Sequence, residues 1–138
     1  MANYNKIGLL VLNNDQTRFL VVQKYPQNVT ADFIMPGGQF EEETIEECLK
    51  NEIKEELNCE VDFDSLGFIS EYEDEAAGRP EKTVSIKLYQ GKLIGIPAPS
   101  TEIEHIHWIT KDDISNPQVS PIIRNKIIPD LVKKNILK

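Results

Sequence analysis

The sequence predicts an α/β domain in which helices pack on a mixed β-sheet. Short apolar runs rich in β-branched residues lie in the first and last thirds of the chain and have the length of strands. Between them, residues 44–57 show helical periodicity, and a second helical segment ends the chain. With 138 residues the chain can bury a real core, and we expect one domain spanning residues 1–138.

The first two strands are expected to form a β-hairpin. Residues 7–12 and 19–23 are apolar, and the sequence "NNDQT" between them supplies the Asn and Asp of a turn. The stretch "DFIMPGG" is then expected to form a short strand that ends at Pro36 and the two glycines.

The central helix has a recognisable start and end. Thr44 and Glu47 form a capping box, so we expect the helix to run from Thr44 to about Leu57. Asn58 tolerates a left-handed conformation and is expected to terminate it.

The remaining strands are predicted from the alternation of apolar and polar residues, and the last helix from the positions of its prolines. Residues 84–88 and 105–109 alternate apolar and polar side chains, as strands with one buried face do. Residues 73–81 are expected to form a charged loop. The last helix is expected to begin at Ser120 and Pro121, with Pro129 kinking or restarting it.

Charge and hydropathy narrow the function classes. A net charge of −8 disfavours binding to nucleic-acid polymers or acidic membranes, so an anionic small molecule would need a counter-cation. The apolar run at 7–12 is too short for a signal peptide or a membrane span, and we expect a cytoplasmic protein. We expect the two cysteines, Cys48 and Cys59, to be reduced.

Glutamates interrupt the apolar stripe of the central helix. At about 100° per residue, Glu52 and Glu56 fall inside the stripe formed by Ile45 and Leu49, and Glu55 lies at its edge. A solvated acidic face is the usual explanation for a Glu-rich helix. Unpaired carboxylates at a core-facing edge are costly, however, and carboxylate oxygens are the ligands that Mg²⁺ or Mn²⁺ prefers. The pattern therefore favours a metal site.

The stretch "PGG", Glu43 and "NEIKEELNC" resembles the Nudix box, G-x5-E-x7-R-E-U-x-E-E-x-G-U with U aliphatic, over about residues 37–59. The strands around the box, Trp108 and the last helix are also similar to MutT-like members of the Nudix hydrolase family. The resemblance implies an α/β/α sandwich with a mixed sheet and a loop-helix-loop catalytic motif. It also implies hydrolysis of a nucleoside diphosphate linked to another moiety, with Mg²⁺, or Mn²⁺, as cofactor.

The resemblance further implies roles for individual residues. Glu52, Glu55 and Glu56 match the metal-binding and water-activating glutamates, without deciding which of them is the base, and Glu43 matches the glutamate that braces the arginine of the box. The carbonyl of Gly37 is a further candidate ligand. So is Glu102, with the acids of residues 73–75 as competitors. Candidate substrate-binding residues are Lys24, Phe33 and Gly38.

The sequence departs from the box at three places. Asn51 stands where the family has arginine, so the usual ion pair with Glu43 cannot form. Asn58 replaces glycine, which is a milder change because Asn also accepts a left-handed turn. The loop between Gly38 and Glu43 is one residue shorter than is usual in the family.

Our first hypothesis is a Mg²⁺-dependent hydrolase that converts a nucleoside triphosphate, ordinary or oxidised, into the monophosphate and pyrophosphate. The alternatives are an ADP-ribose or nucleotide-sugar pyrophosphatase and a weakened member that binds a nucleotide or protein partner without turnover. His105 and His107 share one strand face but lack a third ligand for zinc. Monomer and homodimer both stay open.

Overall fold

The computed structural model describes residues 2–25, 32–41 and 43–138. Its strands are β1 (Tyr4–Leu10), β2 (Phe19–Lys24), β3 (Gly37–Gln39), β4 (Glu60–Ala76), β5 (Arg79–Ile94) and β6 (Ile103–Ile109). Four of them build a mixed sheet in the order β3-β1-β5-β4, in which β1 runs parallel to β5 and the other pairs are antiparallel. The antiparallel pair β2 and β6 forms a second sheet.

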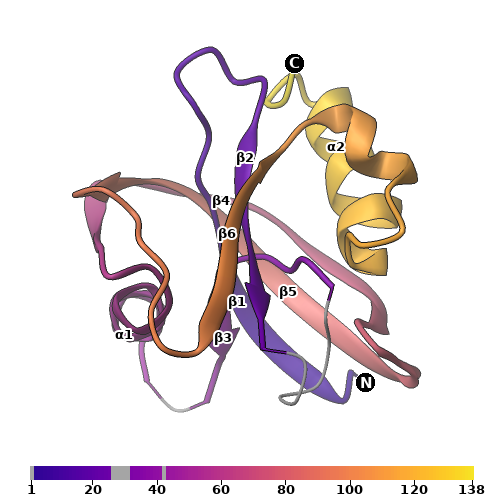
Figure 1. Ribbon diagram of the computed structural model, residues 1–138, viewed down its shortest axis with the longest axis horizontal. Helices are drawn as coiled ribbons and strands as arrows, with labels where there is room; N and C mark the ends of the chain where they lie inside the picture. Colours follow the sequence, from indigo (N-terminus) through magenta and orange to yellow (C-terminus); the bar gives the residue numbers. More distant parts are fainter. Residues whose placement is uncertain (1, 26–31, 42) are drawn as a thin grey trace.

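The helical elements are α1 (Ile45–Leu57), the 3₁₀-helix η2 (Lys111–Ser115), the π-helix η3 (Ile123–Ile127) and α2 (Ile128–Lys133). Figure 1 shows α1 and α2 on opposite sides of the strands. Among the described residues, no helix is both long enough and apolar enough to span a membrane.

Two hydrophobic cores lie on the two faces of the strands. Ile7 and Leu9 of β1 pack with the apolar side of α1, whereas Leu10 packs with the C-terminal helical segment. One strand thus supplies both layers, because successive side chains point to opposite faces. The predicted α/β/α sandwich is confirmed.

Helix α1 is capped at both ends as predicted. The hydroxyl of Thr44 accepts a hydrogen bond from the N–H of Glu47 at 3.1 Å, and the Glu47 carboxylate accepts one from the N–H of Thr44 at 3.3 Å. Asn58 adopts the left-handed conformation, with φ 55°. These local interactions set where the glutamates of α1 lie around the helix axis.

The predicted hairpin between the first two strands holds only near its turn. The N–H of Leu20 donates to the carbonyl of Val11 at 3.1 Å, and the side chain of Asn13 accepts from the backbone of Arg18 at 2.9 Å. Beyond this turn the strands separate, because β1 is already paired on both edges, with β3 and β5, and β2 pairs with β6 instead. The separation opens space between the two sheets.

Two further predictions were wrong in part. Residues 73–81 are mostly strand, because β4 and β5 continue their antiparallel pairing to a tight turn at Ala77 and Gly78. The charges of this stretch signalled exposure to solvent, which a strand edge also provides. The stretch "DFIMPGG" makes only isolated bridges at Phe33 and Ile34, and its strand, β3, begins at Gly37.

The C-terminal helical segment passes through Pro129 without a break. The N–H of Ile128 donates to the carbonyl of Ile123, five residues earlier, so the turn is widened into a π-helix. A proline lacks an N–H and crowds the carbonyl four residues before it, and a wider turn relieves this crowding. A new helix, α2, therefore begins at Ile128 with Pro129 in its first turn, which is the expected restart, although no gap separates it from the π-helix.

Candidate active site

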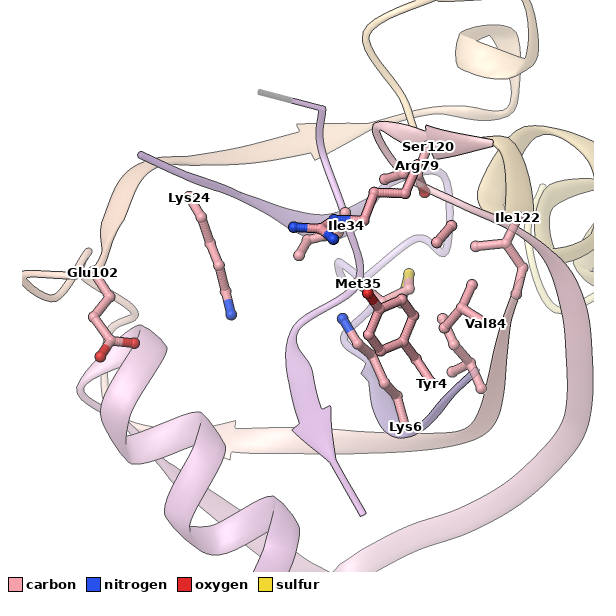
Figure 2. A pocket seen from close by; sticks show the side chains of 13 residues that line it. Tyr4, Lys6, Lys24, Ile34, Met35, Arg79, Val84, Glu102, Ser120 and Ile122 are labelled. Carbon is pink, nitrogen blue, oxygen red and sulfur yellow. The ribbon is translucent and has the colours of Figure 1, made fainter. Parts of the chain in front are cut away.

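A cavity of about 430 Å³ opens where β1 and β2 separate. Figure 2 shows Glu102 and Lys24 on one side of it and Val84 and Ile122 on the other. Most of the wall is apolar, and the polar side chains include three cationic groups. The lining residues that matter below are Lys6, Lys24, Ile34, Arg79, Glu102 and Ser120.

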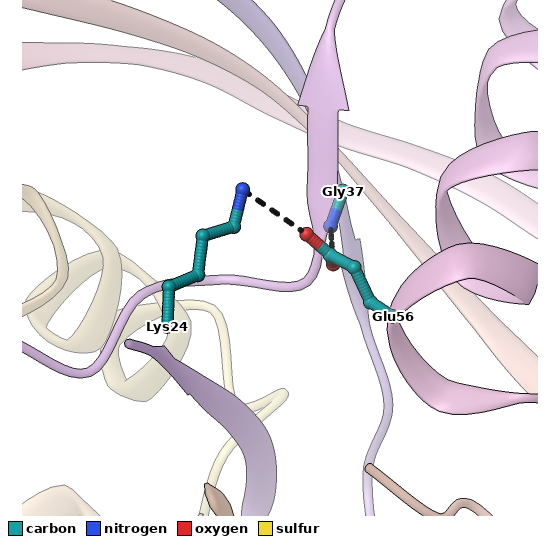
Figure 3. Close-up of polar contacts among 3 residues, drawn as sticks. All are labelled: Lys24, Gly37 and Glu56. Carbon is teal, nitrogen blue, oxygen red and sulfur yellow. Dashed lines mark hydrogen bonds and ion pairs between the residues drawn. The ribbon is translucent and has the colours of Figure 1, made fainter. Parts of the chain in front are cut away.

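Glu56 is held in a buried position by β3 and by the end of β2. Glu56 is 1% exposed, and one of its carboxylate oxygens accepts a hydrogen bond from the N–H of Gly37 at 3.0 Å. The other oxygen lies 3.6 Å from the ammonium nitrogen of Lys24 (Figure 3). Burial raises the pKa of Glu56 to about 7, although the Gly37 N–H and Lys24 both favour its charged form.

Glu52 lies one turn earlier on α1, against Gly38. A Cβ atom at Gly38 would collide with the carboxyl group of Glu52, so the approach of helix and strand depends on a glycine here. Burial raises the pKa of Glu52, and the charges of Glu55 and Glu102 add to this effect. These carboxylates are therefore close enough to repel one another.

The carboxylates do not form a closed metal site as the side chains stand. Within residues 2–25, 32–41 and 43–138, no three His, Cys, Asp or Glu side chains are gathered closely enough to hold an ion. Glu56 is turned toward Gly37 and Lys24, and Glu55 is exposed. The donor set nevertheless fits a hard divalent cation, because it consists of carboxylates on adjacent helical turns whose mutual repulsion such a cation would relieve.

Residues 5–131 match the family described as the NUDIX domain. The chain belongs to the Nudix family. Its members are hydrolases that act on pyrophosphate bonds of small molecules and generally use divalent metal cations, so this chain is a Nudix hydrolase. No curated protein sequence matches the chain.

Solved structures with the same fold include several Nudix proteins. The MutT protein from Methanosarcina mazei Go1 superposes with a TM-score of 0.77 at 18% identity, covering 96% of this chain and 94% of the other. The E. coli ORF135 protein gives a TM-score of 0.72 at 17% identity over 96% and 90% of the two chains. The MutT NUDIX hydrolase from Burkholderia pseudomallei gives 0.71 at 17% identity over 93% and 97%. At these identities the likeness establishes the fold.

The glutamate before α1 contacts the helix through the side chain of Cys48 and not through position 51. Glu43 accepts a hydrogen bond from the N–H of Glu41 at 3.0 Å, and this bond holds the pKa of Glu43 below its usual range. Asn51 is exposed, and no hydrogen bond joins it to Glu43 in the described part of the chain. Glu43 also does not line the cavity. The contact predicted for the family's arginine is thus lost with the arginine itself.

The candidate substrate-binding residues are divided between cavity and core. Lys24 lines the cavity, whereas Gly38 is not among its lining residues and lies against Glu52. Phe33 does not line the cavity, and its ring stacks on His107 with 5.2 Å between centroids, so its role in substrate binding stays a prediction. Neighbouring side chains of an extended segment face opposite ways, and here Ile34 takes the cavity side.

Glu102 lines the cavity, whereas the competing acids of residues 73–75 lie on β4 and do not. Sequence reasoning missed Lys6, Arg79 and Ser120, which the fold brings to the same cavity. For Lys6 a signal existed, because alternation along β1 places it on the same side as Gly8 and Leu10. Arg79 and Ser120 carry no such local signal.

Proposed function

We propose that this Nudix hydrolase cleaves a nucleoside triphosphate, ordinary or oxidised, into the nucleoside monophosphate and pyrophosphate in a Mg²⁺-dependent reaction, with Mn²⁺ as a substitute. The observation that carries the proposal is one cavity with Glu102 and Lys24 at one end and apolar walls at the other, in which Lys24 links the cavity to Glu56 of α1 at 3.6 Å. Its volume of about 430 Å³ is in the range of small-molecule sites. We further propose a cytoplasmic, single-domain protein, monomeric or homodimeric, that does not bind nucleic-acid polymers.

The proposed metal ligands are Glu52, Glu55 and Glu56, with Glu102 and the carbonyl of Gly37 as additional ligands. When bound, the divalent cation neutralises charge on the phosphate oxygens and lowers the pKa of a bound water. A carboxylate of this group that is not fully engaged accepts the proton of the attacking water.

Other parts of the cavity bind and orient the substrate. Lys24 is 3.6 Å from Glu56, which is longer than a charge-assisted hydrogen bond, and its ammonium group can transfer from that carboxylate to a phosphate oxygen. The apolar wall, which includes Ile34, Met35 and Ile86, buries the base and excludes water from it. Binding both ends of the substrate aligns the scissile bond with the carboxylates of α1.

A panel of nucleotides, incubated with purified protein and Mg²⁺, tests the proposal through product identification. We expect pyrophosphate and a nucleoside monophosphate from at least one triphosphate, and no product when EDTA replaces Mg²⁺. Cleavage of ADP-ribose, a nucleotide sugar or a dinucleoside polyphosphate, with no triphosphate turned over, would refute the proposed substrate class.

A second candidate function is nucleotide binding with little turnover. It is favoured by Asn51, which is exposed and makes no hydrogen bond with Glu43 among the described residues, so the contact that the family makes at this position is missing. Asn51→Arg tests this candidate, because it restores the missing charge. Strong turnover in the variant alone would support the candidate, and comparable turnover in the unaltered protein would exclude it.

A further inference from the structure

Lys6 places a cation inside the cavity that no role described above requires. It lies on β1 between Gln39 of β3 and Ile86 of β5, which is an interior position of the sheet. Its side chain lines the cavity, and Figure 2 shows its ammonium group directed into the same space as that of Lys24. A lysine at an interior strand position costs desolvation free energy that an apolar residue would avoid.

The charge of Lys6 has no direct partner. Within the described residues, its ammonium group makes no ion pair and no hydrogen bond, whereas Lys24 pairs with Glu56 at 3.6 Å. Burial and the charge of Lys24 both lower the pKa of Lys6, and the charges of Glu56 and Glu52 oppose this effect. Two cations therefore share one cavity, and an anion bound between them would relieve both the repulsion and the lost hydration.

We propose that Lys6 and Lys24, here called the lysine pair, form a binding site for the pyrophosphate moiety of the substrate that does not depend on a metal ion. Ammonium groups bind phosphate oxygens as point charges through charge-assisted hydrogen bonds. The chain has a net charge of −8, so the attraction for an anion is local to the cavity. The choice of pyrophosphate as ligand rests on the proposed function.

The position of the lysine pair also indicates its effect on the reaction. The pair lies next to Glu56, since the ammonium nitrogen of Lys24 is 3.6 Å from its carboxylate. A pyrophosphate group held there would meet the carboxylates of α1. In this arrangement Lys6 of β1 positions the substrate, and α1 supplies the carboxylates that the substrate meets.

Two other roles for Lys6 make different predictions. Lys6 could serve only to offset the charges of Glu52 and Glu56, or its methylene groups could simply cover the apolar wall. When Lys6 is replaced by Met, the first role would change folding stability or Mg²⁺ affinity, whereas the second would change neither, because Met keeps an apolar side chain. Neither would change the binding of an anion in the absence of metal.

The experiment measures pyrophosphate binding in EDTA by calorimetry for the wild type, Lys6→Met and Lys92→Met. Methionine keeps most of the apolar volume of lysine without its charge, and Lys92, an exposed lysine on β5, serves as the matched control. We expect the wild type and Lys92→Met to bind equally, and Lys6→Met to bind at least about tenfold more weakly. Equal affinity in Lys6→Met and the wild type, or no binding by the wild type in EDTA, would overturn the proposal.

A charge-preserving variant shows whether weaker binding in Lys6→Met comes from the lost charge or from misfolding. Lys6→Arg keeps the positive charge and should retain pyrophosphate binding. If Lys6→Arg binds pyrophosphate as weakly as Lys6→Met does, the role of charge is refuted. Thermal unfolding should show Lys6→Met as stable as the wild type or more so, because an unpaired cation leaves the cavity.

Nucleotide hydrolysis separates this proposal from the proposed function. In Lys6→Met the KM for the triphosphate should rise about tenfold with a smaller change in kcat, because ground-state binding is lost. Suppose that neither the wild type nor any variant hydrolyses a triphosphate, but Lys6→Met still binds pyrophosphate more weakly than the wild type. The lysine pair is then supported as an anion site, and the proposed function is refuted. If the triphosphate is hydrolysed and Lys6→Met leaves both KM and pyrophosphate binding unchanged, the proposed function is supported and the lysine pair is refuted.

Discussion

The stability of the metal-free protein should depend on pH through Glu56. Burial raises the pKa of Glu56 to about 7, compared with 4.5 for an ordinary glutamate, which approximates the unfolded chain. Between these values the folded protein binds the proton that the unfolded chain has released. The contribution of Glu56 is therefore fully present below pH 4.5 and is lost as the pH rises through about 7.

The size of the effect follows from the same two values. The difference between about 7 and 4.5 corresponds to about 3 kcal/mol of unfolding free energy, at about 1.4 kcal/mol per pKa unit. No discount for solvent screening applies, because Glu56 is 1% exposed. Glu56→Gln removes the titrating group but keeps an oxygen that can accept the N–H of Gly37.

Urea unfolding in EDTA, followed by the fluorescence of Trp108 at several pH values between 4.5 and 7.5, measures this contribution. The free energy of unfolding of the wild type minus that of Glu56→Gln should fall by about 3 kcal/mol across this range. The difference is diagnostic, because other carboxylates such as Asp130 have a lowered pKa and act in the opposite direction. Parallel curves for the two proteins would refute the assignment of a buried, proton-binding Glu56.

Two further predictions concern the candidate site. Gly38→Ala should displace Glu52 and lower Mg²⁺-dependent hydrolysis by about a hundredfold, whereas Gly67→Ala, where an added Cβ meets nothing within 4 Å, should leave the rate unchanged in the same assay. Glu55→Gln should lower the rate by about a hundredfold or more with little change in melting temperature, because Glu55 is exposed and is a proposed ligand. Glu46→Gln, at an exposed position in the first turn of α1, is its control; equal rates in both would remove Glu55 from the site.

Much of the fold was predictable because it is encoded in local patterns. The capping box at Thr44, the stop at Asn58 and the periodicity of α1 involve residues within a few positions of one another, so sequence alone located the helix. The same periodicity placed Glu56 on the core-facing side, where the structure buries it. The resemblance of residues 37–59 to the Nudix box gave the family, which the match over residues 5–131 establishes.

The predictions that failed concern pairings between distant segments. The sequence predicted a hairpin of residues 7–12 and 19–23, which holds only near its turn. Beyond the turn, β1 is paired on both edges with other strands, and β2 pairs with β6. Sequence alone also did not show that Ile34 takes the cavity side and that the ring of Phe33 stacks on His107. Strand partners and facing directions depend on which edges remain free after the whole sheet forms.

By itself, the sequence determined a capped helix with carboxylates on its buried side and membership of a hydrolase family. Only the tertiary structure decided what those carboxylates meet. Gly37 and Lys24 bind Glu56, and β1 brings Lys6 into the cavity beside them. The physical reason is that a helix orients its own side chains through local hydrogen bonds, whereas a cavity forms only where separate strands diverge.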